Sequence, residues 1–373
     1  MTMSESIEKV AMPKWGLSMS TGRITEWLVS EGDQIAKGDD LADIDTDKIA
    51  GTLEATNSGV LRRIVAHPGE DVPVGGTIAL VAPSEVPEAD IEAAATLARQ
   101  ELDSGAVQEV TGPTTAAVEV DGRTLAYAAL GEADDGLGEP VVLVHGYGGD
   151  KNSWLFVQEP LALRRPVYAL DLPGHGESSK DVGDGSLDTL AGAVLGFLSE
   201  LGVARAHLVG HSLGGAVVTA AAAARQEAVA SLTLVAPAGF GARINAGYLR
   251  GFATASSRRE LKPHLGALFA EPSQVTRKLA DDLLRYKRLD GVGRALETLL
   301  GTLLDGDAQG IDAAPLLSRV QAPVATVWGR EDAVLPVSNA AGLAEVTVVG
   351  GAGHLVHLER PGEVVAVIER LLA

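Results

Sequence analysis

Short apolar runs alternate with longer stretches of helical periodicity in the C-terminal two thirds of the chain. Six runs have the composition of buried strands: Val141 to Val144, Val167 to Leu170, His207 to Val209, Leu232 to Val235, Val324 to Val327 and Val346 to Val349. Between them the spacing predicts helices such as Leu187 to Leu201 and Ala216 to Glu227. Buried strands that alternate with helices indicate an α/β domain with a mostly parallel, doubly wound sheet. A long helical pattern from Phe240 to Leu317 interrupts this order and predicts a cap inserted over the sheet.

The N-terminal part of the chain has an all-β pattern, in which glycines separate short strand-like segments. When the sequence is displaced by 37 positions, so that Thr21 meets Ser58, the segment Thr21 to Asp45 falls without a gap on Ser58 to Ala82. Glycines and apolar positions coincide in the two copies, which lets two half-sheets share one core. Lys48 lies in the hinge between the copies, so residues 6–82 are expected to form a small duplicated β-domain with this lysine at a turn.

Residues 83–113 separate the two patterns. They begin with a proline-rich acidic string, continue through the alanine-rich stretch Ala89 to Leu102, and end at Pro113. Because like charges repel and proline stiffens the backbone, we expect an extended linker that includes one helix at most. The α/β domain is then expected to occupy residues 114–373, with its cap at about 240–317.

Composition narrows the classes of function. A chain of 373 residues with 46% hydrophobic content favours two domains with ample cores. The net charge of −20 disfavours nucleic acid as a partner, because phosphates require cationic contacts. The chain has no cysteine, which excludes disulfides, thiolate zinc sites and a cysteine nucleophile, and we expect no metal centre.

The same sequence favours a cytoplasmic protein that does not enter the membrane. The residues from Met1 to Val10 lack the apolar core of a secretory signal. The most apolar stretch, Leu213 to Ala224, is too short to cross a bilayer, and a buried helix explains it.

The string Gly210-His211-Ser212-Leu213-Gly214 follows one predicted strand and precedes a predicted helix. A turn this tight leaves no room for side chains near the serine, so glycine is required two residues before it and two after it. The turn would hold the Ser212 hydroxyl above the sheet as a nucleophile. In a chain with 44 glycines such a string can arise by chance, but its position between strand and helix favours the catalytic interpretation.

The partners expected for this serine follow in the order Asp, His. Asp332 comes shortly after a predicted strand, at the sheet edge where α/β proteins place their sites. Glu331 is the competing carboxylate, but the spacing from Gly329 favours Asp332. His354 lies in a glycine-rich loop after the last strand and is the expected base. His357 is its rival, although a surface loop position is the simpler interpretation of His357.

A glycine-rich string after the first core strand, from His145 to Gly149, can turn backbone amides toward the site. The amides of Tyr147 and Leu213 are the expected oxyanion hole. His145 is expected to be structural, and the segment Asp171 to Ser178 is expected to brace the loop without a chemical role.

From Ala117 to its C-terminus the chain resembles the α/β-hydrolase family. The resemblance is carried by the nucleophile elbow, the His-Gly oxyanion segment, the Gly-His-Gly-x-Ser loop and the ending from Gly353 to Pro361. It implies that Ser212, Asp332 and His354 form a catalytic triad. It does not specify a substrate, because this fold hosts many chemistries.

Residues 6–82 resemble a lipoyl domain, on the strings Met12-Pro13-Lys14-Trp15-Gly16 and Asp45-Thr46-Asp47-Lys48. The resemblance implies that Lys48 carries lipoate through an amide. A biotin carrier shares the duplicated fold, but its lysine usually lies between two methionines. Lys48 has no methionine on either side. An ordinary exposed turn lysine is the remaining alternative.

The pairing of the two domains resembles the acyltransferase components of acetoin dehydrogenase complexes. That family implies acetyl transfer from the lipoyl group to CoA as co-substrate. It also implies a thiamine-diphosphate-dependent acetoin dehydrogenase and a dihydrolipoamide dehydrogenase as partners, and a homo-oligomer. The chain departs from ordinary 2-oxo acid dehydrogenase acyltransferases in two ways: it lacks their His-x-x-x-Asp-Gly ending, and residues 83–113 are acidic where those proteins have a basic subunit-binding domain.

The sequence leaves two alternatives open. The triad fits an ester or thioester hydrolase equally well, and only the lipoyl-like domain argues against it. A carrier or scaffold without catalysis is the third hypothesis, and it gains if the three triad residues do not converge in the structure.

Overall fold

The computed structural model describes residues 7–13, 19–45, 50–55, 57–105, 112–131 and 138–372. Tertiary contacts divide the chain into two compact units, Met1–Pro113 and Thr114–Ala373. Each unit has a hydrophobic core of its own.

The first unit consists of two four-stranded sheets. One sheet has the order β1-β8-β6-β3, and the other has the order β5-β4-β2-β7. Their bounds are β1 Glu8–Ala11, β2 Thr21–Trp27, β3 Gln34–Ile35, β4 Asp40–Asp45, β5 Ala50–Glu54, β6 Gly59–Ile64, β7 Asp71–Pro73 and β8 Thr77–Ala82. The strands β2, β3 and β4 recur 37 positions later as β6, β7 and β8, so the duplication of the sequence is also a duplication of structure.

The two copies differ most clearly in the burial of one equivalent apolar pair. Val65 is 5% exposed, whereas Leu28, which precedes it by 37 positions, is 45% exposed. Val65 lies in a cluster with Ile91 and Ala98 of helix α1 (Glu88–Ser104). The helix therefore covers the second copy of the repeat, and this difference in burial follows from that packing.

Helix α1 is the one helix that was allowed for residues 83–113, but it packs on the β-domain, whereas an extended segment was expected. It is 17 residues long, ends at Gly105 in a left-handed conformation, and buries Ile91 and Ala98. Arg63 of β6 pairs with Glu88 and Glu92 of the helix, and Arg99 pairs with Glu70 at 2.8 Å. Glu88 and Glu92, whose charges suggested repulsion, instead find an arginine partner on the β-domain.

The second unit has an eight-stranded sheet of order β18-β17-β14-β13-β11-β12-β10-β9. The pairs from β12 to β18 are parallel, and the hairpin β9–β10 adds antiparallel strands at one edge. The strand bounds are β9 Thr114–Val120, β10 Arg123–Leu130, β11 Val141–Val144, β12 Val167–Leu170, β13 Ala206–His211, β14 Val229–Val235, β17 Val324–Gly329 and β18 Val346–Val349. This confirms the predicted mostly parallel α/β sheet.

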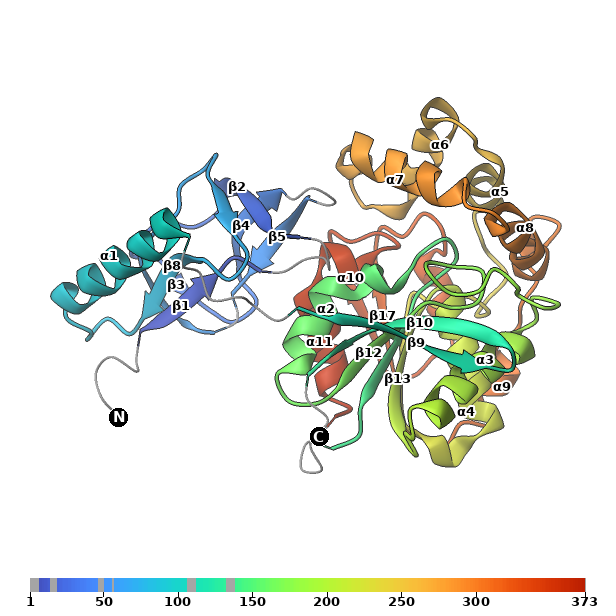
Figure 1. Ribbon diagram of the computed structural model, residues 1–373. Helices are drawn as coiled ribbons and strands as arrows, with labels where there is room; N and C mark the ends of the chain where they lie inside the picture. The colour runs from blue at the N-terminus through green and yellow to red at the C-terminus, as the bar shows by residue number, and fades with distance from the viewer. Residues whose placement is uncertain are drawn as a thin grey trace. The chain divides into compact units, whose positions relative to one another are not determined.

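Helices cover both faces of this sheet, as Figure 1 shows. Helices α3 (Leu187–Glu200) and α4 (Leu213–Ala224) contribute to one hydrophobic cluster, and α2 (Leu155–Ala162) and α11 (Pro361–Glu369) contribute to the other. Near them lie η2 (Lys151–Trp154), α9 (Ala314–Leu317) and α10 (Val356–Glu359).

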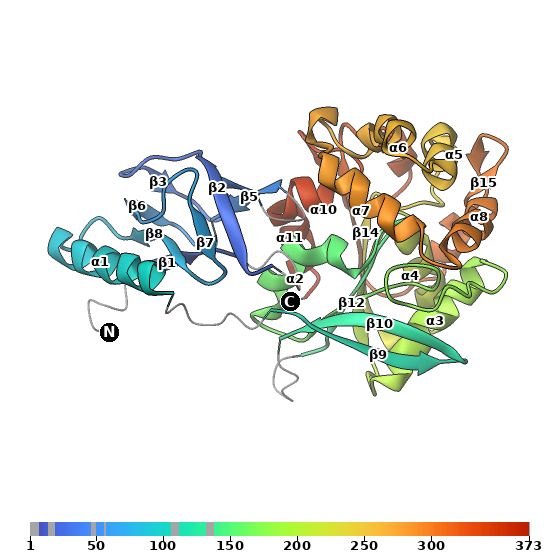
Figure 2. The ribbon, with the colours of Figure 1, turned by 45° about the horizontal axis from the view of Figure 1, so that its top comes forward.

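The expected cap lies between β14 and β17. It contains α5 (Ala246–Thr254), α6 (Arg258–Leu265), α7 (Arg277–Lys287) and α8 (Val292–Leu303), with the short hairpin β15 (Leu304–Asp305) and β16 (Ala308–Gln309). Figure 2 shows these helices gathered at one end of the α/β unit. Within the described part of the chain, no helix has the length and apolar character that crossing a membrane requires.

Candidate active site

Ser212 occupies the turn between β13 and α4. Its backbone has φ 52° and ψ −119°, a conformation that a non-glycine residue adopts only under strain. A Cβ on Gly210 would stand 2.4 Å from the Gly214 carbonyl oxygen, and a Cβ on Gly214 would stand 2.3 Å from the Val144 oxygen. The steric requirement for glycine on both sides of the serine therefore holds in this fold.

Asp332 and His354 are joined directly. Nδ1 of His354 lies 2.8 Å from Oδ2 of Asp332, and both side chains are buried. Because an ionised carboxylate only accepts hydrogen bonds, this contact places the proton on Nδ1 and leaves Nε2 free to act as a base.

His354 also lies against the nucleophile turn. Its ring centroid is 4.6 Å from that of His211, the residue before Ser212, and Nε2 of His211 donates to the His354 carbonyl oxygen at 3.0 Å. The structure thus brings Asp332 and His354 into contact and places His354 beside the turn that carries Ser212.

The loop from His145 to Gly149 approaches the same turn. A Cβ on Gly146 would stand 2.8 Å from the Ser212 Cβ, so the loop backbone is in close contact with the serine. The Gly149 amide donates to the Gly146 oxygen at 3.1 Å, and the Gly148 amide donates to His175 Nε2 at 3.1 Å. Within the described residues the Tyr147 and Leu213 amides donate no such bond, which suits the oxyanion role expected for them.

His145 is structural in this arrangement. Its Nδ1 donates to the Gly146 oxygen at 2.8 Å, and its Nε2 accepts from the Leu172 amide at 3.0 Å. Burial lowers the pKa of His145, so the ring is neutral and serves to hold two loops together.

Sequence reasoning missed a buried ion pair behind this loop. Lys151 is 2% exposed, and its ammonium lies 2.9 Å from Asp171 and 2.9 Å from Glu177. The Lys151 and Glu177 amides also donate to the Asp171 carboxylate. The segment from Asp171 braces the loop from His145 to Gly149 directly, through Leu172 and His175, and it also holds a lysine that no motif singled out. This loop is called the oxyanion loop below, after the role proposed for it.

The two rivals have other roles. The side chain of Glu331 accepts from the Ala352 amide at 3.1 Å and so supports the histidine loop. His357 is 0% exposed, which corrects the expectation of a surface loop residue. It packs between Trp154 and His211 at centroid distances of 4.6 Å and 4.4 Å, and burial lowers its pKa to about 3. The start of α10 turns this side chain inward, which its position in a loop-like string did not indicate.

Lys48 lies outside the described residues. It belongs to the connection between β4 and β5, whose ends Asp45 and Ala50 are paired in register. In the cap, Arg250 pairs with Asp307 and Arg258 pairs with Asp281.

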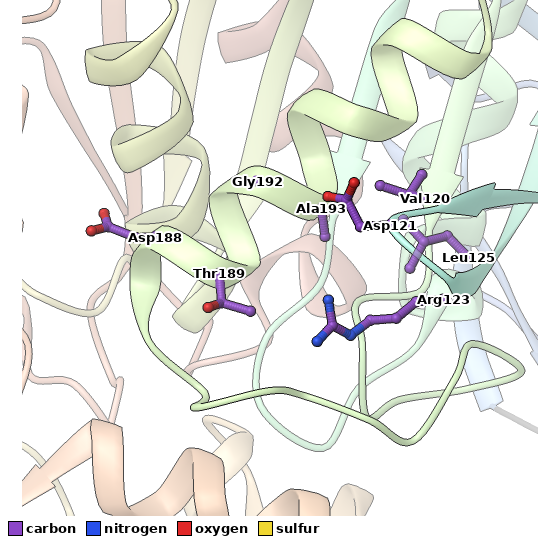
Figure 3. A pocket seen from close by; sticks show the side chains of 8 residues that line it. All are labelled: Val120, Asp121, Arg123, Leu125, Asp188, Thr189, Gly192 and Ala193. Atoms are coloured by element: carbon purple, nitrogen blue, oxygen red, sulfur yellow. The ribbon is translucent and has the colours of Figure 1, made fainter.

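A cleft of about 370 Å³ lies between the β9–β10 hairpin and α3 (Figure 3). Its lining residues are Val120, Asp121, Arg123, Leu125, Asp188, Thr189, Gly192 and Ala193. None of these is a candidate site residue, and Arg123 is paired with Asp181 at 3.2 Å. The cleft therefore adds nothing to the catalytic arrangement.

Both units of the chain match known protein families. Residues 139–361 match the α/β hydrolase fold, and residues 8–81 match the family described as biotin-requiring enzymes, which covers biotin and lipoyl carriers. Among solved structures, a bacterial membrane phospholipase A is 28% identical, with a TM-score of 0.60, and the match covers 70% of this chain and 86% of that one. A meta-cleavage product hydrolase from Pseudomonas fluorescens, at 21% identity and a TM-score of 0.61 over 69% of this chain and 96% of its own, shares the fold.

Two curated relatives match almost the entire chain. Both are named the dihydrolipoyllysine-residue acetyltransferase component of an acetoin cleaving system. The protein from Pseudomonas putida is 47% identical over 96% of each chain. The protein from Cupriavidus necator is 41% identical over 99% of this chain and 98% of its own.

Proposed function

Since this chain belongs to the family of dihydrolipoyllysine-residue acetyltransferase components of acetoin cleaving systems, we propose that it transfers an acetyl group from a lipoyl thioester to the thiol of CoA. The observation that carries the proposal is the presence, on one chain, of a lipoyl-type domain and a hydrolase-type site with its Asp332–His354 pair.

Lys48 is the proposed attachment point of lipoate. The two duplicated sheets and the paired ends of β4 and β5 suit a carrier that presents one lysine between them. When bound there, the lipoyl group supplies a dithiol that holds the acetyl group as a thioester. Attachment to the same chain raises the effective concentration of the substrate to about the millimolar range.

His354 and Ser212 are the proposed acid–base and nucleophile. His354 Nε2 takes the Ser212 proton, and the serine oxygen attacks the thioester carbonyl, with the amides of Tyr147 and Leu213 donating to the oxyanion. The carbon–sulfur bond breaks, and His354 returns the proton to the leaving thiolate. CoA then attacks the acetyl-Ser212 ester after His354 takes its thiol proton; the carbon–oxygen bond breaks, a new thioester forms, and His354 returns the proton to the Ser212 oxygen.

The names of the relatives describe components of a system, and we propose that this chain also works in a multienzyme complex. Its proposed partners are a thiamine-diphosphate-dependent acetoin dehydrogenase and a dihydrolipoamide dehydrogenase. We further propose a homo-oligomer in the cytoplasm.

The test combines intact mass with a transfer assay. Mass spectrometry of the purified chain is expected to find lipoate on Lys48, and Lys48→Arg is expected to remove it. With free S-acetyl-dihydrolipoamide and CoA, the wild type and Lys48→Arg should both form acetyl-CoA, because the reacting groups lie in the second unit. A direct route is the alternative, in which His354 activates CoA and Ser212 only donates a hydrogen bond. Trapping an acetyl-Ser212 ester supports the covalent route, and unimpaired transfer by Ser212→Ala would exclude it.

A hydrolase is the second candidate function, because the phospholipase and the meta-cleavage product hydrolase share this fold. The two activities differ in their product: release of free acetate supports hydrolysis, and formation of acetyl-CoA supports transfer. A scaffold without catalysis predicts neither product, and the Asp332–His354 contact argues against it.

A further inference from the structure

Helix α5 of the cap connects the two sides of the candidate site. At its start, the Asn245 amide donates to the Val334 oxygen at 2.8 Å, and the Asn245 side chain donates to the Ala333 oxygen at 3.0 Å. These acceptors directly follow Asp332. The first turn of α5 is therefore anchored to the loop that carries the acidic member of the triad.

The other end of α5 rests on the oxyanion loop. Ring atoms of Phe252 lie 2.5 Å from the point where a Cβ on Gly148 would stand, so the ring packs directly on this backbone. The Tyr147 ring meets Phe252 edge to face, with centroids 5.8 Å apart. Phe252 is 2% exposed. The ring of Tyr248, one turn earlier in the helix, has its centroid 6.1 Å from that of Phe252. Two aromatic rings thus line the stretch from Asp332 to Gly148.

The end of α5 that carries Phe252 is held in place by the rest of the cap. The Lys287 ammonium donates to the Phe252 and Ala255 carbonyl oxygens and lies 5.4 Å from the Phe252 ring centroid. The Tyr147 hydroxyl donates to the Leu296 oxygen of α8 at 3.0 Å. The position of the Phe252 ring over the loop is therefore determined by α7 and α8 as well as by its own helix.

We propose that Phe252 sets the size of the acyl group, by closing the space beside the oxyanion loop so that an acetyl group fits and longer chains do not. The inference rests on the proposed function and makes it more specific. The Phe252 ring packs on Gly148, the residue after the Tyr147 amide that is proposed to bind the acyl carbonyl, so a longer chain on this side of the carbonyl would meet the ring. A benzyl side chain fastened at both faces cannot move aside at low cost, because packed interiors leave few voids.

The test compares acyl groups of increasing length. S-acetyl-, S-butyryl- and S-hexanoyl-dihydrolipoamide are offered with CoA to the wild type, Phe252→Ala and Phe252→Leu. The wild type should prefer the acetyl group. Phe252→Ala should raise the ratio of hexanoyl kcat/KM to acetyl kcat/KM by about tenfold or more, because that is the effect of giving a pocket room for one or a few methylenes. A ratio unchanged within about twofold overturns the proposal.

Leu261→Ala in α6 is the matched control. It removes a buried apolar side chain from the same cap, in a helix that packs on α5 and α7. It should leave the ratio at the wild-type value, and an equal rise in this variant would assign the effect to a loosened cap and overturn the role of Phe252. Phe252→Leu keeps most of the buried volume, so it supplies the comparison if the alanine variant does not fold, with a smaller rise expected.

A second readout separates this inference from the proposed transfer. p-Nitrophenyl acetate, butyrate and hexanoate report acylation of Ser212 without CoA. If acetyl-CoA does not form but Phe252→Ala still shifts the ester preference toward hexanoate, the transfer proposal fails and the assignment of Phe252 stands. If acetyl-CoA forms and neither ratio shifts, the assignment fails alone.

Discussion

The carboxylate of Asp332 holds His354 while three further donors hold the carboxylate. Oδ2 lies 2.8 Å from His354 Nδ1 and accepts from Trp328 Nε1 at 3.1 Å. Oδ1 accepts from the amides of Val334 and Leu335, each at 2.8 Å. A buried carboxylate with this many donors is held in a fixed position, which is what orientation of an imidazole base requires.

Replacing Asp332 by asparagine should therefore damage catalysis more than stability. The amide can donate to Nδ1, which favours the wrong tautomer of His354, and a loss of about 10⁴-fold in kcat is expected. CoA-dependent deacylation of S-acetyl-dihydrolipoamide measures it. The control is Glu331→Gln, which keeps an oxygen for the Ala352 amide and should lose less than about tenfold. Equal losses in the two variants would remove Asp332 from the triad.

The buried pair behind the oxyanion loop predicts a large effect on stability. Lys151→Met leaves the Asp171 carboxylate buried without its cation, which should lower the free energy of unfolding of the second unit by roughly 3–5 kcal/mol. Arg258→Met breaks the more exposed pair with Asp281 in the same unit and should cost less than about 1 kcal/mol. Urea unfolding of both variants at neutral pH gives the comparison, and similar costs would contradict the burial argument.

His357 predicts how stability depends on pH. Its pKa is lowered by burial from an ordinary 6.5 to about 3, so the unfolded chain takes up a proton over this interval and the folded chain does not. Stability is then lost as the pH falls from 6.5 toward 3, by up to about 1.4 kcal/mol per pH unit for this residue. His357→Phe should flatten the decline by that amount.

At neutral pH the same variant should be at least as stable as the wild type. Both ring nitrogens of His357 are buried without a hydrogen-bond partner among the described residues, and phenylalanine removes that cost. Urea midpoints at about pH 7, 6, 5 and 4 test both statements. His207→Phe should flatten the decline in stability over a shorter pH interval. The reason is that the pKa of His207 is lowered only to about 4, with burial as the main cause. If His357→Phe leaves the slope of stability against pH unchanged, the prediction is contradicted.

Helix α1 provides a test of its packing on the β-domain. Ile91→Ala removes a fully buried side chain and should destabilise the first unit by about 2–4 kcal/mol. Leu97→Ala on the same helix changes a side chain that is 52% exposed and should shift stability by less than about 0.5 kcal/mol. Thermal unfolding of the lipoyl-type unit, followed through the Trp27 signal, separates the two. If Ile91→Ala has no effect, the helix does not contribute to this core.

Features that depend on neighbours in sequence were predictable. The glycines around Ser212 are required by clashes within a single turn, and the same clashes appear in the structure at Gly210 and Gly214. The duplication was also visible in the sequence, where apolar positions coincide in the two copies. The structure agrees, because β2 and β6 bury the equivalent residues Ile24 and Leu61. Periodicity and local sterics act over a few residues, so a linear pattern records them.

Features that depend on distant elements were decided by the tertiary structure. The contact between Asp332 and His354 joins residues that are 22 positions apart, and the burial of His357 follows from how α10 meets Trp154. Lys151 became an internal cation only because the loop after β12 folded over it. The sequence by itself determined the two folds and the order of the candidate catalytic residues. Their contacts, and the aromatic cover that α5 lays on the oxyanion loop, arise from packing between segments that no local pattern relates.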